Sequence, residues 1–226
     1  MNIKIIGLGG IGSILSDQIC RFANYSIDSF QVKISLIDGD DYEYKNSERQ
    51  SFNSLGSKAD VKQNELSRKF SKLIISSIPS YVTNENISTI ILDGDLILMG
   101  VDNHKTRKIV SDYCKTLDNV TLISGGNDYT DGNVQIYCRK EAKDLTPDLC
   151  DYHPEINNPR DKLPTEMSCE ELSKSEPQLL FTNLTAATLM CQAFYNAGIR
   201  NEIKYCESYF DITTMKADSK IRKVKS

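Results

Sequence analysis

The sequence of 226 residues predicts an α/β fold: a Rossmann-like, doubly wound, mostly parallel sheet with added C-terminal strands. Three observations predict it. Short apolar runs alternate with segments in which apolar residues recur at helical spacing. A glycine-rich turn, residues 7–13, joins the first apolar run to the first helical segment. An acidic residue, Asp38, follows the second apolar run.

The expected elements follow one another in the order that a parallel sheet requires. The expected strands are short and rich in β-branched residues, and they cover residues 3–6, 32–37, 87–92, 96–99, 120–123, 133–138 and 203–210. The expected helices have apolar residues at helical spacing, and they cover residues 11–22, 59–75, 103–117 and 179–197. Gly198 follows the last helix, where a glycine C-cap is typical.

We expect residues 1–213 to form a single domain, followed by a flexible basic tail at 214–226. Within the domain, residues 139–177 contain five of the six prolines and many charges. This segment is therefore predicted to be a long irregular crossover loop, and loops of such length are often functional.

Composition excludes several classes of protein. Lys and Arg number 27 against 31 Asp and Glu, so the protein lacks the cationic surplus of a nucleic-acid-binding protein. No apolar run approaches the roughly 18 residues of a membrane span, and residue 1 leads directly into the first strand without a signal peptide. The seven cysteines are odd in number and form no CxxC pair, so we expect reduced thiols, a cytoplasmic protein and no zinc.

The glycine turn and Asp38 together indicate a nucleotide-binding protein. Glycines let backbone N–H groups approach a phosphate at the positive end of a helix, and an acid after the second strand can accept a hydrogen bond from ribose. The spacing of Gly7, Gly9 and Gly12 also fits an NAD-dependent oxidoreductase. A glycine turn that serves only helix–strand packing is the third alternative.

Later residues favour a triphosphate over a dinucleotide. Asn46, Arg49 and Gln50 follow Asp38 within twelve positions, and guanidinium and amide groups of this kind can grip phosphate oxygens. Asp102 follows the apolar strand at 96–99 and is therefore expected at the carboxyl edge of the sheet. A carboxylate there is suited to hold Mg²⁺ on phosphates.

These motifs, with Asp102, Asn103 and Arg107 in a D-N-x3-R pattern, resemble the ThiF/MoeB-like adenylyltransferases and the adenylation domain of ubiquitin-activating enzymes. The resemblance is strong from residue 3 to 138, and residues 168–189 look like the closing part of compact bacterial members. It implies binding of ATP and Mg²⁺ and adenylation of the C-terminal carboxylate of a ubiquitin-like or sulfur-carrier protein that ends in glycine. Pyrophosphate is the second product.

The resemblance also assigns roles to residues. The glycines that would line the nucleotide are Gly9, Gly10 and Gly12. Asp38 would hold the ribose with Asp40 nearby, and Asp102 would coordinate Mg²⁺. The phosphate contacts would be Asn46, Arg49 and Gln50, together with a lysine. Counting from Arg49 favours Lys62 for this lysine, whereas the local pattern at residues 56–59 favours Lys58; we lean to Lys62.

Some relatives carry a cysteine that receives the activated acyl group, and Cys169 lies where that cysteine is expected. A conjugating enzyme or a sulfur donor would then be a further partner, and the sequence does not choose between protein conjugation and sulfur transfer. A homodimer is expected, although we expect the family's N-terminal arginine that reaches across the dimer to be missing or replaced. A non-catalytic partner subunit of an activating enzyme is an alternative, but it predicts loss of Arg49 or Asp102, and both are present.

Overall fold

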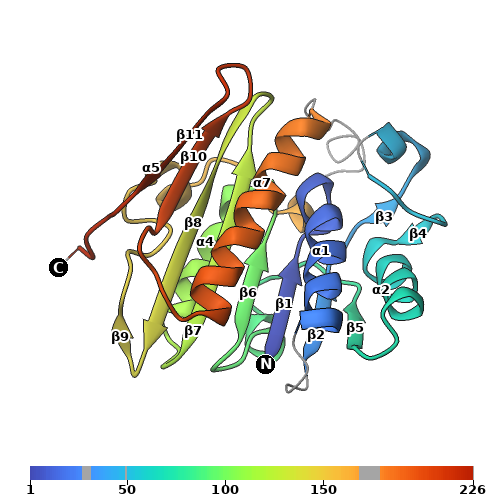
Figure 1. Cartoon of the computed structure of the whole chain (residues 1–226), viewed down its shortest axis with the longest axis horizontal. Coiled ribbons are helices and arrows are strands. Elements are labelled where there is room, and N and C mark those ends of the chain that lie inside the picture. Colours follow the sequence, from blue (N-terminus) through green and yellow to red (C-terminus); the bar gives the residue numbers. More distant parts are fainter. Residues whose placement is uncertain (27–31, 49, 168–178, 226) are drawn as a thin grey trace.

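The computed structural model describes residues 1–26, 32–48, 50–167 and 179–225. Across these residues one nine-stranded sheet runs through the molecule in the order β11-β10-β8-β7-β6-β1-β2-β5, with β9 paired to β8 (Figure 1). The parallel strands are β1 (Asn2–Ile6), β2 (Lys33–Ile37), β5 (Ile74–Ile78), β6 (Leu96–Met99) and β7 (Val120–Asn127). The antiparallel strands are β8 (Asp131–Lys140), β9 (Lys143–Asp144), β10 (Glu207–Asp211) and β11 (Lys216–Lys220). The predicted mostly parallel α/β fold is confirmed.

Helices cover both faces of the sheet. One face carries α1 (Gly10–Ser26), α2 (Lys58–Lys69) and α7 (Leu180–Ala193), which are in front in Figure 1. The other face carries α3 (Ile87–Ile90), α4 (His104–Cys114) and α5 (Pro154–Asn157). Short 3-10 segments, η1 (Tyr44–Glu48) and η2 (Pro164–Glu166), and a small ribbon of β3 (Asp41–Tyr42) and β4 (Gly56–Ser57) complete the described elements.

Two apolar cores form because the central strands are buried on both faces. Ile5 and Leu98 point into the core beneath α1 and α7, whereas the neighbouring Ile6 and Met99 point into the core beneath α4. All four residues of β6 are buried, so its sequence is a continuous apolar run.

The structure corrects two elements that were predicted between β2 and β6. The expected strand at 87–92 is helical in α3, because Ile87, Ile90 and Ile91 bury one side at helical spacing while the residues between them are exposed. The expected helix at 59–75 ends at Lys69, and its last apolar residues belong instead to β5. This strand pairs in parallel with β2, and the spacing of its apolar residues in the sequence did not reveal the pairing.

Two expectations near the C-terminus also differ from the structure. The last helix continues after Ala193 as a π-helix, η3 (Phe194–Ile199), so Gly198 lies inside it rather than capping it. A Cβ on Gly198 would lie 2.3 Å from the Leu96 side chain, and the glycine therefore serves close packing. Residues 216–220 of the segment expected to be a flexible tail form β11, because their backbone pairs with β10 although their side chains show no alternating apolar pattern.

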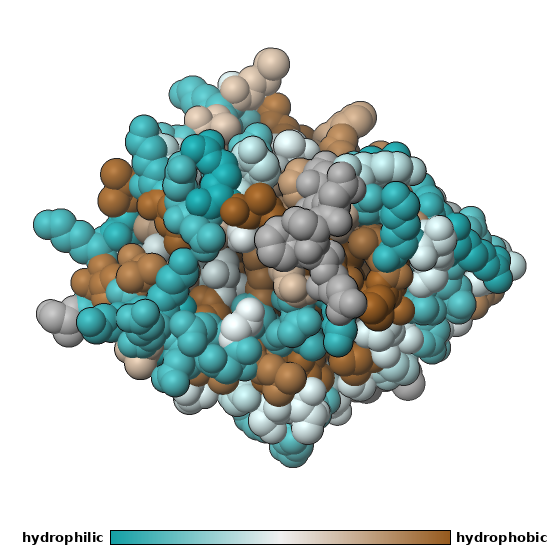
Figure 2. Space-filling model, turned by 60° about the horizontal axis from the view of Figure 1, so that its bottom comes forward, coloured by the Kyte–Doolittle hydropathy of each residue, from teal (hydrophilic) through white to brown (hydrophobic). Residues whose placement is uncertain are grey.

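The lower side of the molecule in Figure 1 comes forward in Figure 2, where apolar and hydrophilic residues are interspersed. Among the described residues, none of the helices combines the length and apolar character needed to cross a membrane. The opposite, upper edge is where the parallel strands end and where α1 begins (Figure 1). That edge carries the pocket described next.

Candidate functional site

A pocket of about 1430 Å³ opens at the carboxyl edge of the parallel strands. It is lined by the ends of β1, β2 and β6, by the β7–β8 turn and by the crossover segment as far as Met167. Binding sites for single small molecules commonly measure roughly 300–1,000 Å³. The pocket is therefore larger than a typical site for one small molecule.

The glycine turn forms one wall of this pocket. Gly7 has a positive φ of 84°, and a Cβ on Gly12 would lie 1.8 Å from the Gly7 carbonyl oxygen. These two glycines make the tight turn possible. Gly9 and Gly10 line the pocket, with open space where a Cβ on Gly9 would be, so the backbone is accessible at the start of α1. Of the three predicted nucleotide glycines, Gly12 instead packs inside the turn.

Asp38 joins the glycine turn to β2. Its carboxylate accepts hydrogen bonds from the backbone N–H groups of Leu8, at 2.6 Å, and of Asp40, at 2.8 Å. The residue is only 9% exposed, and burial raises its pKa above the usual value although nearby Lys58 opposes this. Asp38 therefore holds the turn in place and presents a small part of its carboxylate to the pocket.

Asp40, Lys58 and Tyr81 form a connected group beside Asp38. The Lys58 ammonium lies 2.9 Å from one oxygen of Asp40, and the Tyr81 hydroxyl donates to the other. Lys58 is the first residue of α2, and its backbone N–H also donates to the Asp40 carbonyl at 2.9 Å. All three side chains line the pocket. Sequence reasoning missed Tyr81, whose only signal is its position three residues after the strand that pairs with β2.

The alternative lysine lies elsewhere. The Lys62 ammonium is 2.8 Å from the Ser51 carbonyl oxygen and 2.9 Å from the Glu65 carboxylate, and it is outside the pocket lining. The structure thus places Lys58, and not the lysine that counting from Arg49 favoured, beside the glycine turn.

Asn46 and Gln50 also belong to the pocket. They are 6% and 7% exposed, and both line the pocket. The Asn46 amide oxygen accepts a hydrogen bond from the Glu43 N–H, which stabilises η1. The Gln50 side-chain oxygen is buried and has no hydrogen-bond partner within the described part of the chain. A buried amide of this kind commonly has a ligand or water as its partner. Arg49 lies outside the described residues.

Asp102 follows β6, as predicted, and its exposed side chain lines the pocket. In the described ranges its carboxylate makes no hydrogen bond or ion pair. Asn103 caps α4 by accepting from the Thr106 N–H at 2.7 Å. Arg107 of the same motif is buried and donates to the carbonyls of Val101, at 2.8 Å, and Gly125, at 3.1 Å. Its guanidinium therefore fixes the connection that carries Asp102.

The crossover segment is fastened to the same connection. The Asp161 carboxylate accepts hydrogen bonds from the backbone N–H groups of His104 and Lys105 at the start of α4. Glu166 forms an ion pair with the Lys105 ammonium at 2.6 Å. These contacts hold the crossover segment at the pocket as far as residue 167. Cys169, the predicted acceptor cysteine, lies outside the described residues.

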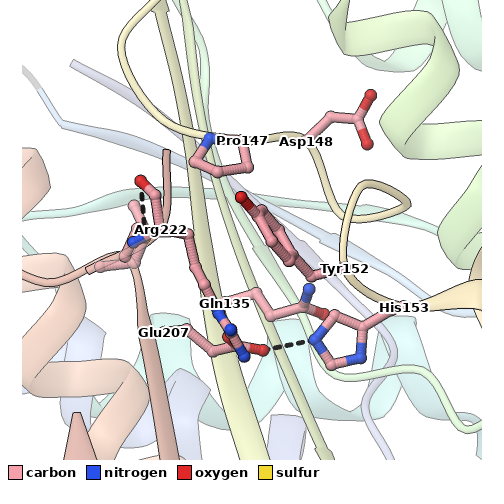
Figure 3. Close-up of a pocket in the computed structure, with 9 residues that line it drawn as sticks. Gln135, Pro147, Asp148, Tyr152, His153, Glu207 and Arg222 are labelled. Atoms are coloured by element: carbon pink, nitrogen blue, oxygen red, sulfur yellow. Dashed lines mark hydrogen bonds and ion pairs between the residues drawn. The ribbon is translucent and has the colours of Figure 1, made fainter. Parts of the chain in front are cut away.

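A second cluster of charged side chains, contributed by β10, the residues after β11 and the start of α5, was not predicted (Figure 3). Its centre is Glu207, only 4% exposed, whose carboxylate accepts from His153, from the Tyr209 hydroxyl at 2.5 Å and from the Arg222 guanidinium at 2.7 Å. Burial alone would raise the pKa of Glu207, but these hydrogen bonds lower it to about 2. The other ring nitrogen of His153 lies 2.7 Å from Glu155. A cavity of about 10 Å³, about the space of one water, adjoins this cluster on one side, and its members His153, Glu155 and Tyr209 also line the large pocket.

The described residues contain no group of three or more His, Cys, Asp or Glu side chains that could enclose a metal ion. Asp102 alone, however, suits Mg²⁺, which keeps several waters and usually binds one or two carboxylates together with substrate phosphates. An ion held in this way needs the nucleotide as well as the protein.

The Rossmann-like sheet, with a glycine turn and acidic groups at the strand ends, defines an α/β protein whose candidate site lies at the carboxyl edge of the sheet. Residues 1–226 match the ThiF family, and the chain belongs to that family. The predicted resemblance is thereby confirmed.

Among known proteins, the chain is 25% identical to the adenylyltransferase and sulfurtransferase MOCS3 of Culex quinquefasciatus over 145 residues, which cover 62% of this chain and 31% of MOCS3. Its structure is similar to that of E. coli MccB crystallised with ATP, with a TM-score of 0.72 at 19% identity over 97% of this chain and 62% of MccB. The structure of PaaA gives a TM-score of 0.72 at 15% identity over 97% and 63%. The chain thus spans less than two thirds of each of these relatives.

Proposed function

We propose that this protein binds ATP with Mg²⁺ and adenylates the C-terminal carboxylate of a protein or peptide substrate. The observation that carries the proposal is the pocket, which is lined by the glycine turn, Lys58 and Asp102 together. In the reaction a carboxylate oxygen attacks the α-phosphorus, the bond to the β-phosphate bridge breaks, and the products are an acyl-adenylate and pyrophosphate. Such a reaction requires positioning and neutralisation of charge more than covalent help from the protein.

The residues have separate tasks in this proposal. The backbone at Gly9 and Gly10 binds phosphate at the positive end of α1, and the Lys58 ammonium moves from Asp40 to the phosphates. The remaining phosphate contacts come from Asn46, Arg49 and Gln50. Asp38 and Asp40 accept hydrogen bonds from the ribose. Lys58 takes this role in place of Lys62 because of its position in the pocket.

Asp102 would hold the Mg²⁺ ion, which neutralises phosphate charge and orients the leaving pyrophosphate when bound. The carboxylate suits this role because it faces the pocket and is not engaged by the described residues around it. Arg107 and Asn103 keep the carboxylate there by fixing the backbone on either side.

The proposed substrate class rests on membership of the ThiF family. We propose a ubiquitin-like or sulfur-carrier protein ending in glycine, whose narrow tail reaches the α-phosphate between the β7–β8 turn and the crossover segment. MOCS3 is named as a sulfurtransferase as well as an adenylyltransferase, and MccB has been crystallised with MccA, so a peptide substrate is the other candidate. Transfer of the acyl group to Cys169, a homodimer and a cytoplasmic location belong to the same proposal.

The NAD-dependent oxidoreductase is the weaker alternative. It accounts for the glycine turn and Asp38 but gives no task to Asn46, Gln50 or Asp102, all of which line the pocket. A non-catalytic subunit has the same weakness, because its site would have no need of Asp102.

Calorimetric titration with Mg·ATP, and with NADH in parallel, tests the proposal. We expect wild type to bind Mg·ATP and not NADH, and Arg49→Ala to bind Mg·ATP about tenfold more weakly or worse, since it removes a charge-assisted contact. Arg200→Ala is the matched control, because Arg200 is exposed and paired only with Glu202 outside the pocket. NADH binding without ATP binding would overturn the proposal.

A further inference from the structure

The Tyr81 side chain touches both Gly39, in the turn after β2, and the Asp40 carboxylate inside the pocket. We propose that Tyr81 is a positioning residue of the nucleotide site, whose hydroxyl holds the Asp40 carboxylate toward the ribose when Lys58 leaves it for the phosphates. The inference rests on the proposed binding of ATP and adds a determinant of ribose recognition to it.

The ring of Tyr81 packs on Gly39, and the backbone that carries it is held by hydrogen bonds. The ring covers Gly39 so closely that a Cβ on Gly39 would lie 2.5 Å from the ring. The Tyr81 carbonyl accepts a hydrogen bond from the Asn86 amide at 2.8 Å, and the Asn86 side-chain oxygen accepts from the Thr83 N–H at 2.8 Å. These contacts hold the turn before α3 in one conformation. The direction of the Tyr81 hydroxyl is therefore set by the fold.

The two carboxylates after β2 are used differently. Both oxygens of Asp38 are engaged by backbone N–H groups, and the residue is 9% exposed. The Asp40 carboxylate, in contrast, is bound by the side chains of Lys58 and Tyr81, and the Asp40 side chain is 43% exposed at the pocket. Asp40 is accordingly the carboxylate that a ribose hydroxyl can reach more fully.

Lys58 cannot serve ribose and phosphate equally. Its ammonium pairs with Asp40 in this structure, and the phosphates of a bound nucleotide bring several negative charges to the same part of the pocket. When Lys58 turns to them, Asp40 keeps one side-chain partner, the Tyr81 hydroxyl. Burial and the hydrogen bond to Asp40 raise the pKa of Tyr81, so the hydroxyl remains a donor throughout the physiological range.

The test compares Tyr81→Phe, which keeps the ring over Gly39 and removes only the hydroxyl, with wild type. Calorimetry gives Kd values for Mg·ATP, Mg·2′-deoxyATP and Mg·3′-deoxyATP. We expect wild type to prefer ATP over at least one deoxynucleotide by about tenfold, and Tyr81→Phe to bind ATP about five- to tenfold more weakly while losing most of that preference. Loss of the preference is a readout that a merely structural tyrosine would not move.

Two controls accompany it. Tyr113→Phe removes a tyrosyl hydrogen bond, to the Ile91 carbonyl, outside the pocket and should change neither Kd nor preference. Asp40→Asn should lose the same preference, and adding Tyr81→Phe to it should reduce the preference no further, because both changes act on one contact.

The outcomes separate the two proposals. Wild type that does not bind Mg·ATP overturns both. Wild type that binds ATP without a preference for the full ribose, or Tyr81→Phe with the wild-type preference, overturns the role of Tyr81 and leaves ATP binding in place.

Discussion

Two clusters of charged side chains adjoin the same pocket, and they differ in how fully their polar groups are satisfied. In the cluster around Glu207, every charged group has a partner: His153 lies between two carboxylates, and Arg222 binds the second oxygen of Glu207. In the cluster at the ends of β2 and β6, the Asp102 carboxylate and the Gln50 side-chain oxygen have none among the described residues.

This difference indicates which of the two clusters is suited to bind a ligand. A fully paired, buried network contributes to the fold, and little changes when a ligand arrives. A buried polar atom without a partner, such as the Gln50 side-chain oxygen, costs stability unless a ligand or water binds it, and the exposed Asp102 carboxylate is accessible to a ligand. We therefore place the chemistry at Asp102 and its neighbours, and assign the Glu207 cluster to holding the C-terminal strands.

We call the polar side chains at the pocket edge, among them Asp40, Gln50 and Asp102, the open cluster. Replacing Asp102 should have the largest effect on activity. Asp102→Ala should lower ATP–pyrophosphate exchange at least about 100-fold, because charge stabilisation at the phosphates is lost. The melting temperature should stay within about 2 °C of wild type, since the exposed carboxylate packs against nothing. Asp112→Ala, at an exposed position of α4 paired with Lys108, is the matched control and should leave exchange unchanged. Near-normal exchange in Asp102→Ala would remove the magnesium role.

Replacing Glu207 tests the fully paired cluster around it, where we expect a loss of stability and not of ATP binding. Glu207→Gln leaves the charges of His153 and Arg222 without their common partner, and we expect a loss of roughly 3 kcal/mol in the free energy of unfolding. Urea denaturation measures it. Affinity for Mg·ATP, measured well below the transition, should remain within about twofold of wild type. Glu202→Gln, whose exposed carboxylate pairs with Arg200, should change stability by less than about 1 kcal/mol. A stable Glu207→Gln protein with lost ATP binding would reverse the assignment of the two clusters.

Variants of the two candidate lysines, Lys58 and Lys62, test which of them contacts the phosphates. Lys58→Met should weaken Mg·ATP binding about tenfold, because it removes a charge-assisted contact. Lys62→Met should leave the Kd within about twofold, since Lys62 is engaged with Ser51 and Glu65 outside the pocket. Calorimetric titration of both variants with Mg·ATP gives the two Kd values to be compared. The reverse order of effects would restore the register that counting from Arg49 favoured.

Sequence patterns predicted what is local. The buried β6 is a continuous apolar run, and the glycine turn, Asp38 and Asp102 lie next to strands that such runs identify. The edge strands β5 and β11 were missed because backbone pairing with a neighbouring strand, and not a side-chain pattern, makes them strands.

The candidate site divides in the same way. Asp40 lies in a recognisable segment, whereas its partner Tyr81 is 41 residues away and has no motif of its own. His153 and Glu207 are 54 residues apart, and only the folded chain brings them together. The position of Lys58 was left open because one residue of spacing decides it, and the contact with Asp40 depends on how α2 begins after β4.

The pH dependence of stability gives the smallest expected effect. Burial would lower the pKa of His153, but the hydrogen bonds to Glu207 and Glu155 raise it above the usual value. A raised pKa in the folded state contributes stability that is fully present below the unfolded value of about 6.5 and is lost as the pH rises through the folded value. The difference in melting temperature between wild type and His153→Gln should therefore shrink by about 2 °C between about pH 6 and about pH 9. A difference that stays constant over this range would mean that His153 is neutral in the folded protein, and that Glu207 depends on Arg222 and Tyr209 alone.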